Sequence, residues 1–449
     1  MRCRTQGLGA GVLLMAGLAA CTPEVILTGT RFPVRAPLEA SLPTEAVADP
    51  AAPPDRPANQ SQPISLPAAS ANANWSQRGG SASHQSPHGA LSASPVLVWA
   101  VPIGQGNSRQ NRIAAAPVVA GGQVFAMDAL STLSAVSTGG ALQWQVDLAA
   151  RFDRDANASG GGLAAENGRV YATTGYGEVV ALDASTGAVV WRQRMGSPAA
   201  GAPGVAGGLV YAMSADGTGW ALDSASGRVV WTLPAAENML ASDTGAAPAI
   251  TGGTVIFPFS AGVMIAAATD SGTPLWQAAI TGNRLGRAFA NSGDITGDPV
   301  VSGGVVYVGT AAGRTGAFSE ATGERLWTAE EGALNPPLVT GGSVFVVSDT
   351  GSLLRLDAGS GARIWGTVLP EFTAAKPRNN LGIFTHFGPV LAGGRLVTVS
   401  SDGALRQFDP ASGAVVGQVA IPGGAASDPA LAGGMMFVVS GQGQLLAFR

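Results

Sequence analysis

The residue types that most often do chemistry in proteins are few in this chain and do not cluster. There are three histidines: His84 and His88 in a polar stretch, and His386 in a loop that leads into a repeated unit. A metal pair at His84 and His88 is conceivable, but two solvated side chains are the simpler expectation. A single histidine such as His386 is more often a hydrogen-bonded loop residue than a ligand.

Asp294, Thr296 and Asp298 form a short acidic run before Pro299. A calcium site would need more oxygen ligands and a closing glutamate, so we expect these side chains to cap a loop. The chain has no Gly-x-Ser-x-Gly motif, phosphate-binding loop or zinc-ligand spacing. We therefore expect no catalytic residue, no metal and no cofactor.

The N-terminus has the pattern of an export signal. Arg2 and Arg4 precede an apolar run over residues 8–20, which is too short to span a bilayer. The run ends in Leu-Ala-Ala-Cys at Cys21, which resembles the lipobox of bacterial lipoproteins. The resemblance implies that residues 1–20 are a cleaved signal peptide and that Cys21 is lipidated. The alternative is an ordinary signal peptide followed by a chance cysteine.

Lipidation at Cys21 would determine where the protein lies. Two acyl chains suffice for stable membrane anchoring. In enterobacterial lipoproteins an aspartate after the cysteine marks inner-membrane retention, whereas this chain has Thr22. The resemblance thus points to the periplasmic face of the outer membrane. Because Cys3 lies in the removed segment, we expect no disulfide in the mature chain.

Composition narrows the class of protein. The chain contains 64 glycines and 29 prolines, and only 12% of its residues are charged, which favours a fold with many tight turns. Its net charge is −4, and loss of Arg2 and Arg4 would make it −6. An acidic chain without a polybasic stretch is poorly suited to bind nucleic acid.

A change in composition predicts the domain boundary. Residues 41–94 are rich in Ala, Pro and Ser and lack apolar periodicity, so we expect an extended, poorly ordered spacer. We assign residues 21–94 to the lipidated N-terminus and this tether, and residues 95–449 to one folded domain. The sequence leaves open whether residues 25–38, which carry some apolar side chains, pack locally.

The folded domain is built from repeats. A hairpin turn containing glycine recurs eight times, at intervals of 38 to 52 residues. A period in the forties with several short strands per unit is typical of a β-propeller blade. The turns are Gly121-Gly122, Asn167-Gly168, Gly207-Gly208, Gly252-Gly253, Gly303-Gly304, Gly341-Gly342, Gly393-Gly394 and Gly433-Gly434.

Residues 203–231 show the strands of one unit. A short apolar strand enters the Gly207-Gly208 turn, where two residues with positive φ are needed. Residues 209–213 form a β-branched and aromatic central strand, residues 220–223 a third strand and residues 229–231 an outer strand. The repeats therefore predict an all-β, eight-bladed propeller of four-stranded antiparallel blades.

Tryptophans recur in the outer strands, where a flat indole can cover the gap to the next blade. The seventh unit has Gly417 at this place. We expect the blade-docking role for Trp99, Trp144, Trp191, Trp231, Trp276, Trp327 and Trp365.

The two ends of the chain predict how the ring closes. The last unit has only three strands before the chain stops at Arg449, and an extra strand, residues 96–101, precedes the first unit. We expect the extra strand to complete the last blade and pair with residues 445–448, which leaves no open edge between the chain ends.

The pattern Ala-x-Asp-x-x-Thr-Gly-x-x-x-Trp, intact from Ala181 to Trp191, resembles the tryptophan-docking repeat of pyrroloquinoline-quinone dehydrogenases. The resemblance covers residues 75–449 and implies the same fold. Those enzymes need a vicinal cysteine pair beside the quinone and a calcium held by Glu, Asn and Asp. Because this chain has no cysteine after Cys21, we expect the repeat to be retained as architecture, without the cofactor.

A secreted lipoprotein with eight such repeats resembles the BamB family, lipoprotein subunits of the machinery that assembles outer-membrane β-barrels. Residues 75–80, Trp-Ser-Gln-Arg-Gly-Gly, are similar to a segment in many relatives of this repeat superfamily. The resemblance implies a non-catalytic scaffold, monomeric within its complex, that binds a periplasmic domain of the barrel subunit BamA.

The resemblance also implies which residues contact that partner, because BamB proteins use loops after the outer strands of neighbouring blades. Leu240 and Asp294 match an exposed leucine and an acidic residue of the family, whereas Asp243 and Thr296 depart from its pattern. Met239 and Leu240 are apolar in a polar loop; they could form an interface centre or tuck under the loop. The matching segments, residues 237–244 and 284–298, give the candidates Met239, Leu240, Asp243, Arg287 and Asp294.

Two other functions are open from the sequence. The chain could be a quinone-dependent dehydrogenase or its remnant, which stabilisation by added quinone and calcium would reveal. It could also be an envelope propeller that binds other proteins or ligands, which a pull-down without the barrel subunit would favour.

Overall fold

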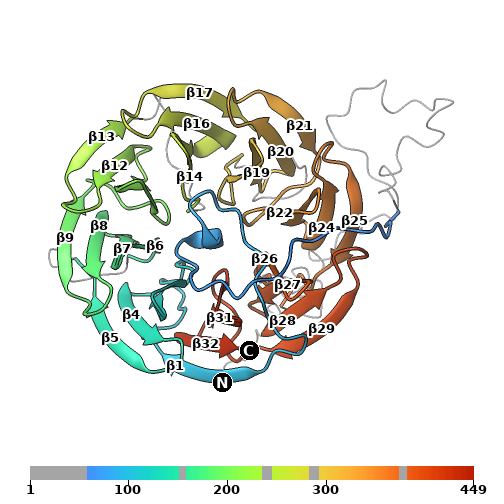
Figure 1. Cartoon of the computed structure of the whole chain (residues 1–449), viewed down its shortest axis with the longest axis horizontal. Coiled ribbons are helices and arrows are strands. Elements are labelled where there is room, and N and C mark those ends of the chain that lie inside the picture. The colour runs from blue at the N-terminus through green and yellow to red at the C-terminus, as the bar shows by residue number, and fades with distance from the viewer. Residues whose placement is uncertain (1–57, 151–157, 235–244, 283–292, 374–381) are drawn as a thin grey trace, which may run out of the picture. The chain divides into compact units, whose positions relative to one another are not determined.

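The computed structural model describes residues 58–150, 158–234, 245–282, 293–373 and 382–449. Eight four-stranded antiparallel sheets in these residues follow one another around a central channel as the blades of a propeller (Figure 1). The predicted fold class is thus confirmed. Residues 1–20 and Cys21 lie outside the described residues.

In blades 1 to 7 the four strands follow the order of the chain, from the innermost strand to the outer one. Blades 1 to 4 consist of β2 (Val118–Ala120), β3 (Gln123–Met127), β4 (Thr132–Ser137) and β5 (Leu142–Asp147); β6 (Gly161–Glu166), β7 (Arg169–Thr174), β8 (Glu178–Asp183) and β9 (Val189–Arg194); β10 (Gly204–Ala206), β11 (Leu209–Met213), β12 (Gly219–Asp223) and β13 (Val229–Leu233); and β14 (Ala249–Thr251), β15 (Thr254–Pro258), β16 (Val263–Ala268) and β17 (Pro274–Ala279).

Blades 5 to 8 consist of β18 (Val300–Ser302), β19 (Val305–Thr310), β20 (Arg314–Ser319) and β21 (Arg325–Ala329); β22 (Leu338–Thr340), β23 (Ser343–Val347), β24 (Ser352–Asp357) and β25 (Arg363–Val368); β26 (His386–Ala392), β27 (Arg395–Ser400), β28 (Ala404–Phe408) and β29 (Val415–Ala420); and β30 (Ala430–Ala432), β31 (Met435–Val439), β32 (Gln444–Phe448) and β1 (Leu97–Pro102). The described helices are the single turns η2 (Arg78–Gly80) and η3 (Ser260–Gly262), and neither is long enough to cross a membrane.

The central strands are apolar along their length because both faces of each blade are covered. In β11, Val210 and Ala212 pack toward blade 2, whereas Tyr211 and Met213 pack toward blade 4. Successive side chains of a strand point to opposite faces of its sheet, so a strand between two neighbours buries every side chain. The hydrophobic core of the ring therefore lies between the blades.

The first turn of blade 3 shows why glycine recurs there. Gly207 and Gly208 have φ of 61° and 81°, and a Cβ on either would meet open space. The constraint is thus the backbone conformation, which glycine adopts at low cost. In blade 2, Asn167 takes the first position with φ of 51°.

In several blades an aspartate holds the third turn. In blade 2 the hydroxyl and backbone N–H groups of Ser185 and Thr186 donate hydrogen bonds to Oδ1 of Asp183. These bonds favour the carboxylate and lower the pKa of Asp183. The turn then closes over Gly187, whose φ is 72°.

Each outer-strand tryptophan lies against the third turn of the following blade. The indole N–H of Trp231 donates to the carbonyl of Thr269 at 3.0 Å, and a Cβ on Gly272 in the same turn would lie 2.6 Å from the indole. The glycine therefore leaves the space that the ring fills. The other six indoles make the equivalent bond at 2.8 to 3.1 Å, from Trp99, Trp144, Trp191, Trp276, Trp327 and Trp365.

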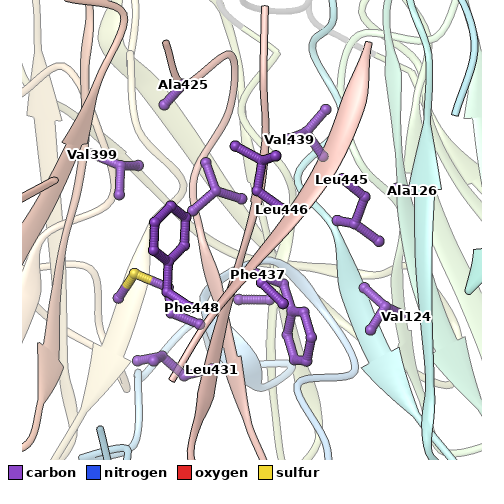
Figure 2. Close-up of a cluster of buried hydrophobic side chains, with 14 of the residues drawn as sticks. Val124, Ala126, Val399, Ala425, Leu431, Phe437, Val439, Leu445, Leu446 and Phe448 are labelled. Carbon is purple, nitrogen blue, oxygen red and sulfur yellow. The ribbon is translucent and has the colours of Figure 1, made fainter. Parts of the chain in front are cut away.

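The ring is closed by pairing of the two chain ends. β1 lies antiparallel to β32, with Leu97 opposite Phe448 and Val101 opposite Leu445. Phe437, Leu446 and other apolar side chains of blade 8 fill the space toward its neighbours (Figure 2). The predicted closure by the N-terminal strand is confirmed.

The alternating strand directions give the propeller two different faces. The first turns of all blades and the third turns of blades 1 to 7 lie at one end of the strands, which we call the turn face. The second turns and the connections between blades lie at the other end, which we call the loop face. The connections include residues 369–385, between β25 and β26.

Candidate functional site: the channel and the loop face

The central channel is occupied by the chain itself. The sequence predicted an extended spacer over residues 41–94, but residues 58–94 lie against the propeller and cross its channel (Figure 1). We call residues 58–94 the strap. Its Trp75 is 1% exposed and packs in the core between blades 8 and 1. The expectation of a poorly ordered spacer is therefore wrong for this part, and residues 41–57 lie outside the described residues.

The strap pairs with the open inner edges of the blades. Trp75 and Val119 of β2 exchange two backbone hydrogen bonds at 2.8 Å. The side-chain amide of Gln77 donates to the carbonyl of Val205 in β10 at 2.6 Å and accepts from its N–H at 3.0 Å. An unpaired strand edge leaves backbone donors and acceptors without partners, and such pairing removes that cost. Within the described residues, the strap forms backbone-directed hydrogen bonds with seven of the eight innermost strands: β2, β6, β10, β14, β18, β26 and β30.

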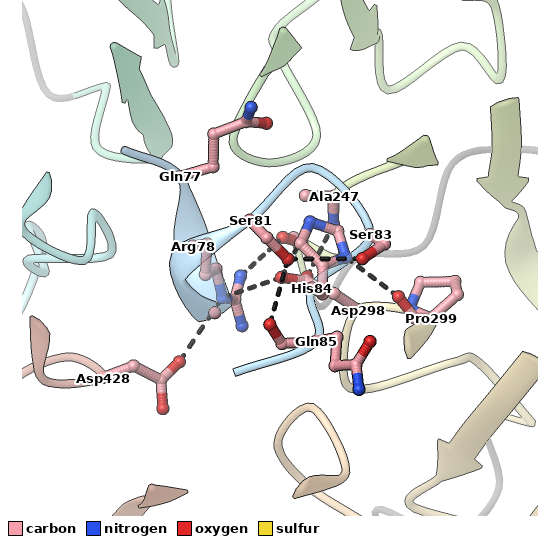
Figure 3. A network of polar contacts seen from close by, with 12 residues as sticks. Gln77, Arg78, Ser81, Ser83, His84, Gln85, Ala247, Asp298, Pro299 and Asp428 are labelled. Atoms are coloured by element: carbon pink, nitrogen blue, oxygen red, sulfur yellow. Dashed lines mark hydrogen bonds and ion pairs between the residues drawn. The ribbon is translucent and has the colours of Figure 1, made fainter. Parts of the chain in front are cut away.

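Arg78 is the charged centre of the channel. Its Nε lies 3.2 Å from a carboxylate oxygen of Asp298 and 3.4 Å from one of Asp428, so one strap cation joins blades 5 and 8 (Figure 3). Burial disfavours the guanidinium charge, but the two carboxylates outweigh this effect and raise the pKa of Arg78. Burial also raises the pKa of Asp428, and Arg78 opposes that rise. Pairing with the two carboxylates offsets the cost of burying the guanidinium.

The histidines of the strap are buried, not solvated as the sequence predicted. His84 is 2% exposed, donates from Nδ1 to the carbonyl of Pro299 at 2.9 Å, and turns Nε2 toward Asp298 at 3.8 Å. His88 donates to the carbonyl of Pro67 and accepts from the N–H of Gly394. Each ring holds the strap to a blade.

The residues considered for metal binding have structural contacts. His386 is hydrogen-bonded, as predicted: its Nε2 donates to Pro370 and its Nδ1 contacts the hydroxyl of Ser400. The acidic run before Pro299 caps neighbouring loops, as predicted: Asp294 accepts from Ala261 N–H, and Asp298 from Ala247 N–H. Among the described residues, no three His, Cys, Asp or Glu side chains are placed to hold a metal ion.

Most of the predicted partner-binding residues lie outside the described part. Met239, Leu240 and Asp243 belong to the connection between β13 and β14, and Arg287 to that between β17 and β18; none of them is described. Asp294 is described on the loop face, half-buried, where its carboxylate holds the backbone of Ala261 beside β16. The grouping of these five residues therefore stays a prediction.

The sequence analysis missed the polar residues of the channel. Gln77 and Arg78 are in the Trp-Ser-Gln-Arg-Gly-Gly segment that carries the family resemblance, but their partners are far away in the chain. Arg78 is 220 residues from Asp298 and 350 from Asp428. The motif itself was the available signal for Arg78. An arginine close to a large apolar residue such as Trp75 is expected to need an acidic partner if the segment is buried.

Comparisons with known proteins agree with this geometry. A family model described as outer membrane protein assembly factor BamB matches residues 129–367 and 372–449. Among curated protein sequences, nothing matches significantly.

Solved structures share the fold at low sequence identity. BamB from Moraxella catarrhalis has a TM-score of 0.64 and 19% identity, covering 79% of this chain and 99% of its own. Quinohemoprotein alcohol dehydrogenase from Comamonas testosteroni has a TM-score of 0.66 and 16% identity, covering 85% and 81%. A europium-containing methanol dehydrogenase has a TM-score of 0.64 and 14% identity, covering 84% and 98%. At such identities the likeness establishes the propeller alone.

Proposed function

Because the chain belongs to the BamB family of outer membrane protein assembly factors, we propose that it is a non-catalytic scaffold that assists the folding and insertion of outer-membrane β-barrels. The observation that carries the proposal is the family match, which extends over most of the propeller. A rigid ring with loops on one face is well suited to hold another protein.

The filled channel supports a scaffold over an enzyme. Gln77, Arg78 and His84 occupy the axis of the ring, and each is bonded to a blade. The residues there do not fit a quinone with calcium, because no cysteine follows Cys21 and the acids at the centre are already paired with Arg78. In this proposal the strap makes the ring a rigid body for binding.

We propose the barrel subunit BamA as the partner, bound through the loop face. The test uses the full chain and the purified periplasmic part of that subunit in a binding titration. The double substitution Leu240→Ala with Asp294→Ala is expected to weaken binding at least about tenfold, or 1.4 kcal/mol. Leu326→Ala, on the exposed outer wall at 53% exposure, is the matched control and should not change the affinity. Unchanged affinity in the double variant would sink the assignment.

We also propose that Cys21 carries the lipid that holds the protein on the periplasmic face of the outer membrane. Cells fed labelled palmitate should label the wild-type chain and not Cys21→Ser. The variant should appear in the soluble periplasmic fraction, because it lacks the acyl chains needed for stable anchoring. Equal labelling of both chains would contradict the proposal.

The dehydrogenase alternative is separated by a ligand titration. Added pyrroloquinoline quinone with calcium would raise the melting temperature if the folded chain bound it, since a ligand of the native state stabilises that state. We expect no shift. A shift that rises with ligand concentration would favour the enzyme.

A further inference from the structure

The loop face carries an apolar cavity that the proposed partner residues do not use. Its volume is about 450 Å³, and it lies where blades 5, 6 and 7 meet. Leu334, Val347 and Phe384 form its walls. Phe372 and Ile383 stand at its opening and are 40% and 59% exposed. Large apolar side chains around a concavity are typical of a binding site and not of an ordinary surface.

The opening is formed by a short ladder of backbone hydrogen bonds. Phe372 lies opposite Ile383, the N–H of Thr373 donates to Gly382 at 3.0 Å, and the N–H of Phe384 donates to Glu371 at 2.8 Å. The ladder holds the two exposed apolar side chains on adjacent strands. The cavity is therefore preformed at its opening, which limits the ordering cost of binding.

The base of the cavity is polar but uncharged at His386. Its Nε2 donates to the carbonyl of Pro370 at 2.8 Å, and its Nδ1 lies 2.6 Å from the hydroxyl of Ser400. Burial lowers the pKa of His386, so the ring is neutral at pH 7. Both ring nitrogens are used inside the protein. The base thus favours an apolar occupant over an ionic one.

The charged groups in the described lining of the cavity have one sign. Asp349 and Glu371 belong to its lining, and the described lining residues include no lysine or arginine. A cationic side chain next to the apolar group of an occupant would therefore be favoured by the local field. An acidic flank would be disfavoured by the same field.

The same blade already binds an extended segment at its outer edge. The N–H of Gln60 donates to Ile364 of β25 at 2.9 Å, and the side-chain amide of Asn59 bonds both backbone groups of Gly366. Outer strands offer such unpaired backbone groups because each is the edge of its sheet. An extended chain is thus a kind of occupant that blade 6 accepts.

We propose that this cavity binds one large apolar side chain, flanked by a lysine or arginine, of an extended segment in an unfolded outer-membrane β-barrel protein. Strands of such barrels alternate apolar and polar residues, so one apolar side chain can enter while its neighbours point away. The proposal rests on the proposed function for its choice of partner. It assigns to blades 5 to 7 a second site, whose described lining contains neither Leu240 nor Asp294.

The test measures binding of labelled twelve-residue peptides to the full-length protein by fluorescence anisotropy. The probe peptide alternates apolar and polar residues and carries a central Phe-Lys pair. Ile383→Glu places a charge at the opening without changing the core, and it should weaken binding at least tenfold. Val368→Glu is the matched control, since Val368 is 78% exposed on the same blade outside the cavity. A peptide with Ser in place of Phe, or Glu in place of Lys, should also bind at least threefold more weakly.

Four results would overturn the proposal. Ile383→Glu could leave peptide binding unchanged, or both variants could weaken it equally. A wild-type dimer that Ile383→Glu dissociates, seen by sedimentation, would assign the cavity to a second copy of the chain. Loss of barrel-subunit binding in Ile383→Glu, without any peptide binding, would assign it to that subunit.

The cavity and the proposed function can fail separately. If the wild-type chain binds the peptide but not the barrel subunit, the partner in the proposed function is wrong and the cavity assignment stands. If it binds the barrel subunit but no peptide, the cavity assignment fails alone.

Discussion

Seven junctions between blades share one arrangement, and the junction between blades 7 and 8 differs. At the seven, an indole donates to a carbonyl in the third turn of the next blade and lies over the glycine of that turn. At the eighth, Gly417 stands in the tryptophan position, and a Cβ there would lie 2.4 Å from Oε1 of the buried Gln407. Gln407 therefore takes part of the space that an indole fills elsewhere.

The difference has its cause in blade 8. Its third strand, β32, and its outer strand, β1, come from opposite ends of the chain, so no turn connects them. Val96 and Arg449 exchange two backbone hydrogen bonds at that place instead. An indole at position 417 would find no turn carbonyl and no turn glycine. Tryptophan and turn therefore work as one unit, and in blade 8, which lacks the third turn, pairing of β1 with β32 takes the place of that turn.

The largest expected effect is at β1, the closing strand of blade 8. Deletion of residues 97–102 removes β1, exposes the edge of β32 and withdraws Trp99 from blade 1. We expect the ring to lose its cooperative thermal transition, since a domain's net stability is only about 5–15 kcal/mol. Calorimetry and near-ultraviolet circular dichroism would measure this, with deletion of residues 46–51 as the control. A wild-type transition in the first variant would show that pairing of the ends is dispensable.

At a junction that has both tryptophan and turn, loss of the tryptophan should lower the free energy of unfolding by less than loss of the closing strand, but still substantially. Trp231→Ala removes the half-buried indole between blades 3 and 4 and should cost about 3 kcal/mol. Trp231→Phe keeps a ring and loses the bond to Thr269, which should cost about 1 kcal/mol. Urea unfolding measures both. Equal costs would mean that the ring volume is not what holds the blades together.

The glycine of the turn gives a direct comparison of the two kinds of junction. In Gly272→Ala the new Cβ meets the indole of Trp231 at 2.6 Å, and the residue keeps a φ of 70°, so we expect a loss of about 2 kcal/mol. In Gly417→Ala the Cβ meets the far end of the Gln407 side chain, and the loss should stay below about 1 kcal/mol. Reversal of this order in urea titrations would contradict the paired arrangement of tryptophan and turn.

The smallest expected effect is a loss of stability at acidic pH. Hydrogen bonds within the third turns lower the pKa of Asp183, Asp223 and Asp409 below the usual 3.8. Because the folded value lies below the unfolded one, the stabilisation is complete above the unfolded pKa and is lost as pH falls through the folded value. The urea midpoint should therefore fall between about pH 5 and 3.

The matching variant replaces all three aspartates by asparagine. Asparagine does not titrate in this range, so the triple variant should show a shallower fall of the midpoint than the wild type. The eighth junction has no turn aspartate and should contribute nothing to the difference. Parallel curves for the two proteins would show that other carboxylates cause the acid dependence.

The propeller could be predicted from the sequence because its blades repeat the same local signals. The first-turn glycines recur in every blade, the outer-strand tryptophan in seven and the Asp183-type aspartate in four, so the spacing of these signals predicted the number of blades. Gly417 was visible as an exception, but its reason needed the neighbouring blade. That reason depends on where the chain ends meet in space.

The contacts of the strap could not be predicted from the sequence, because its buried residues do not recur at a regular spacing. Ile64 and Leu66 pack on blade 6, Trp75 packs between blades 8 and 1, and Gln77 bonds blade 3, so successive residues meet different surfaces. An element with one buried face produces a repeat of 2 or 3.6 residues, whereas a segment that visits many blades does not. Composition alone therefore favoured a spacer.

The same geometry bears on when the protein can finish folding. Synthesis delivers the strap before the blades, but its partners extend to Leu431 and Asp428 in blade 8. Contacts between residues so far apart in sequence form late and slowly. Arg78 must therefore wait for nearly the whole polypeptide before its charge is matched. The strap therefore cannot fasten an incomplete ring, and its ion pairs form only when the last blade is present.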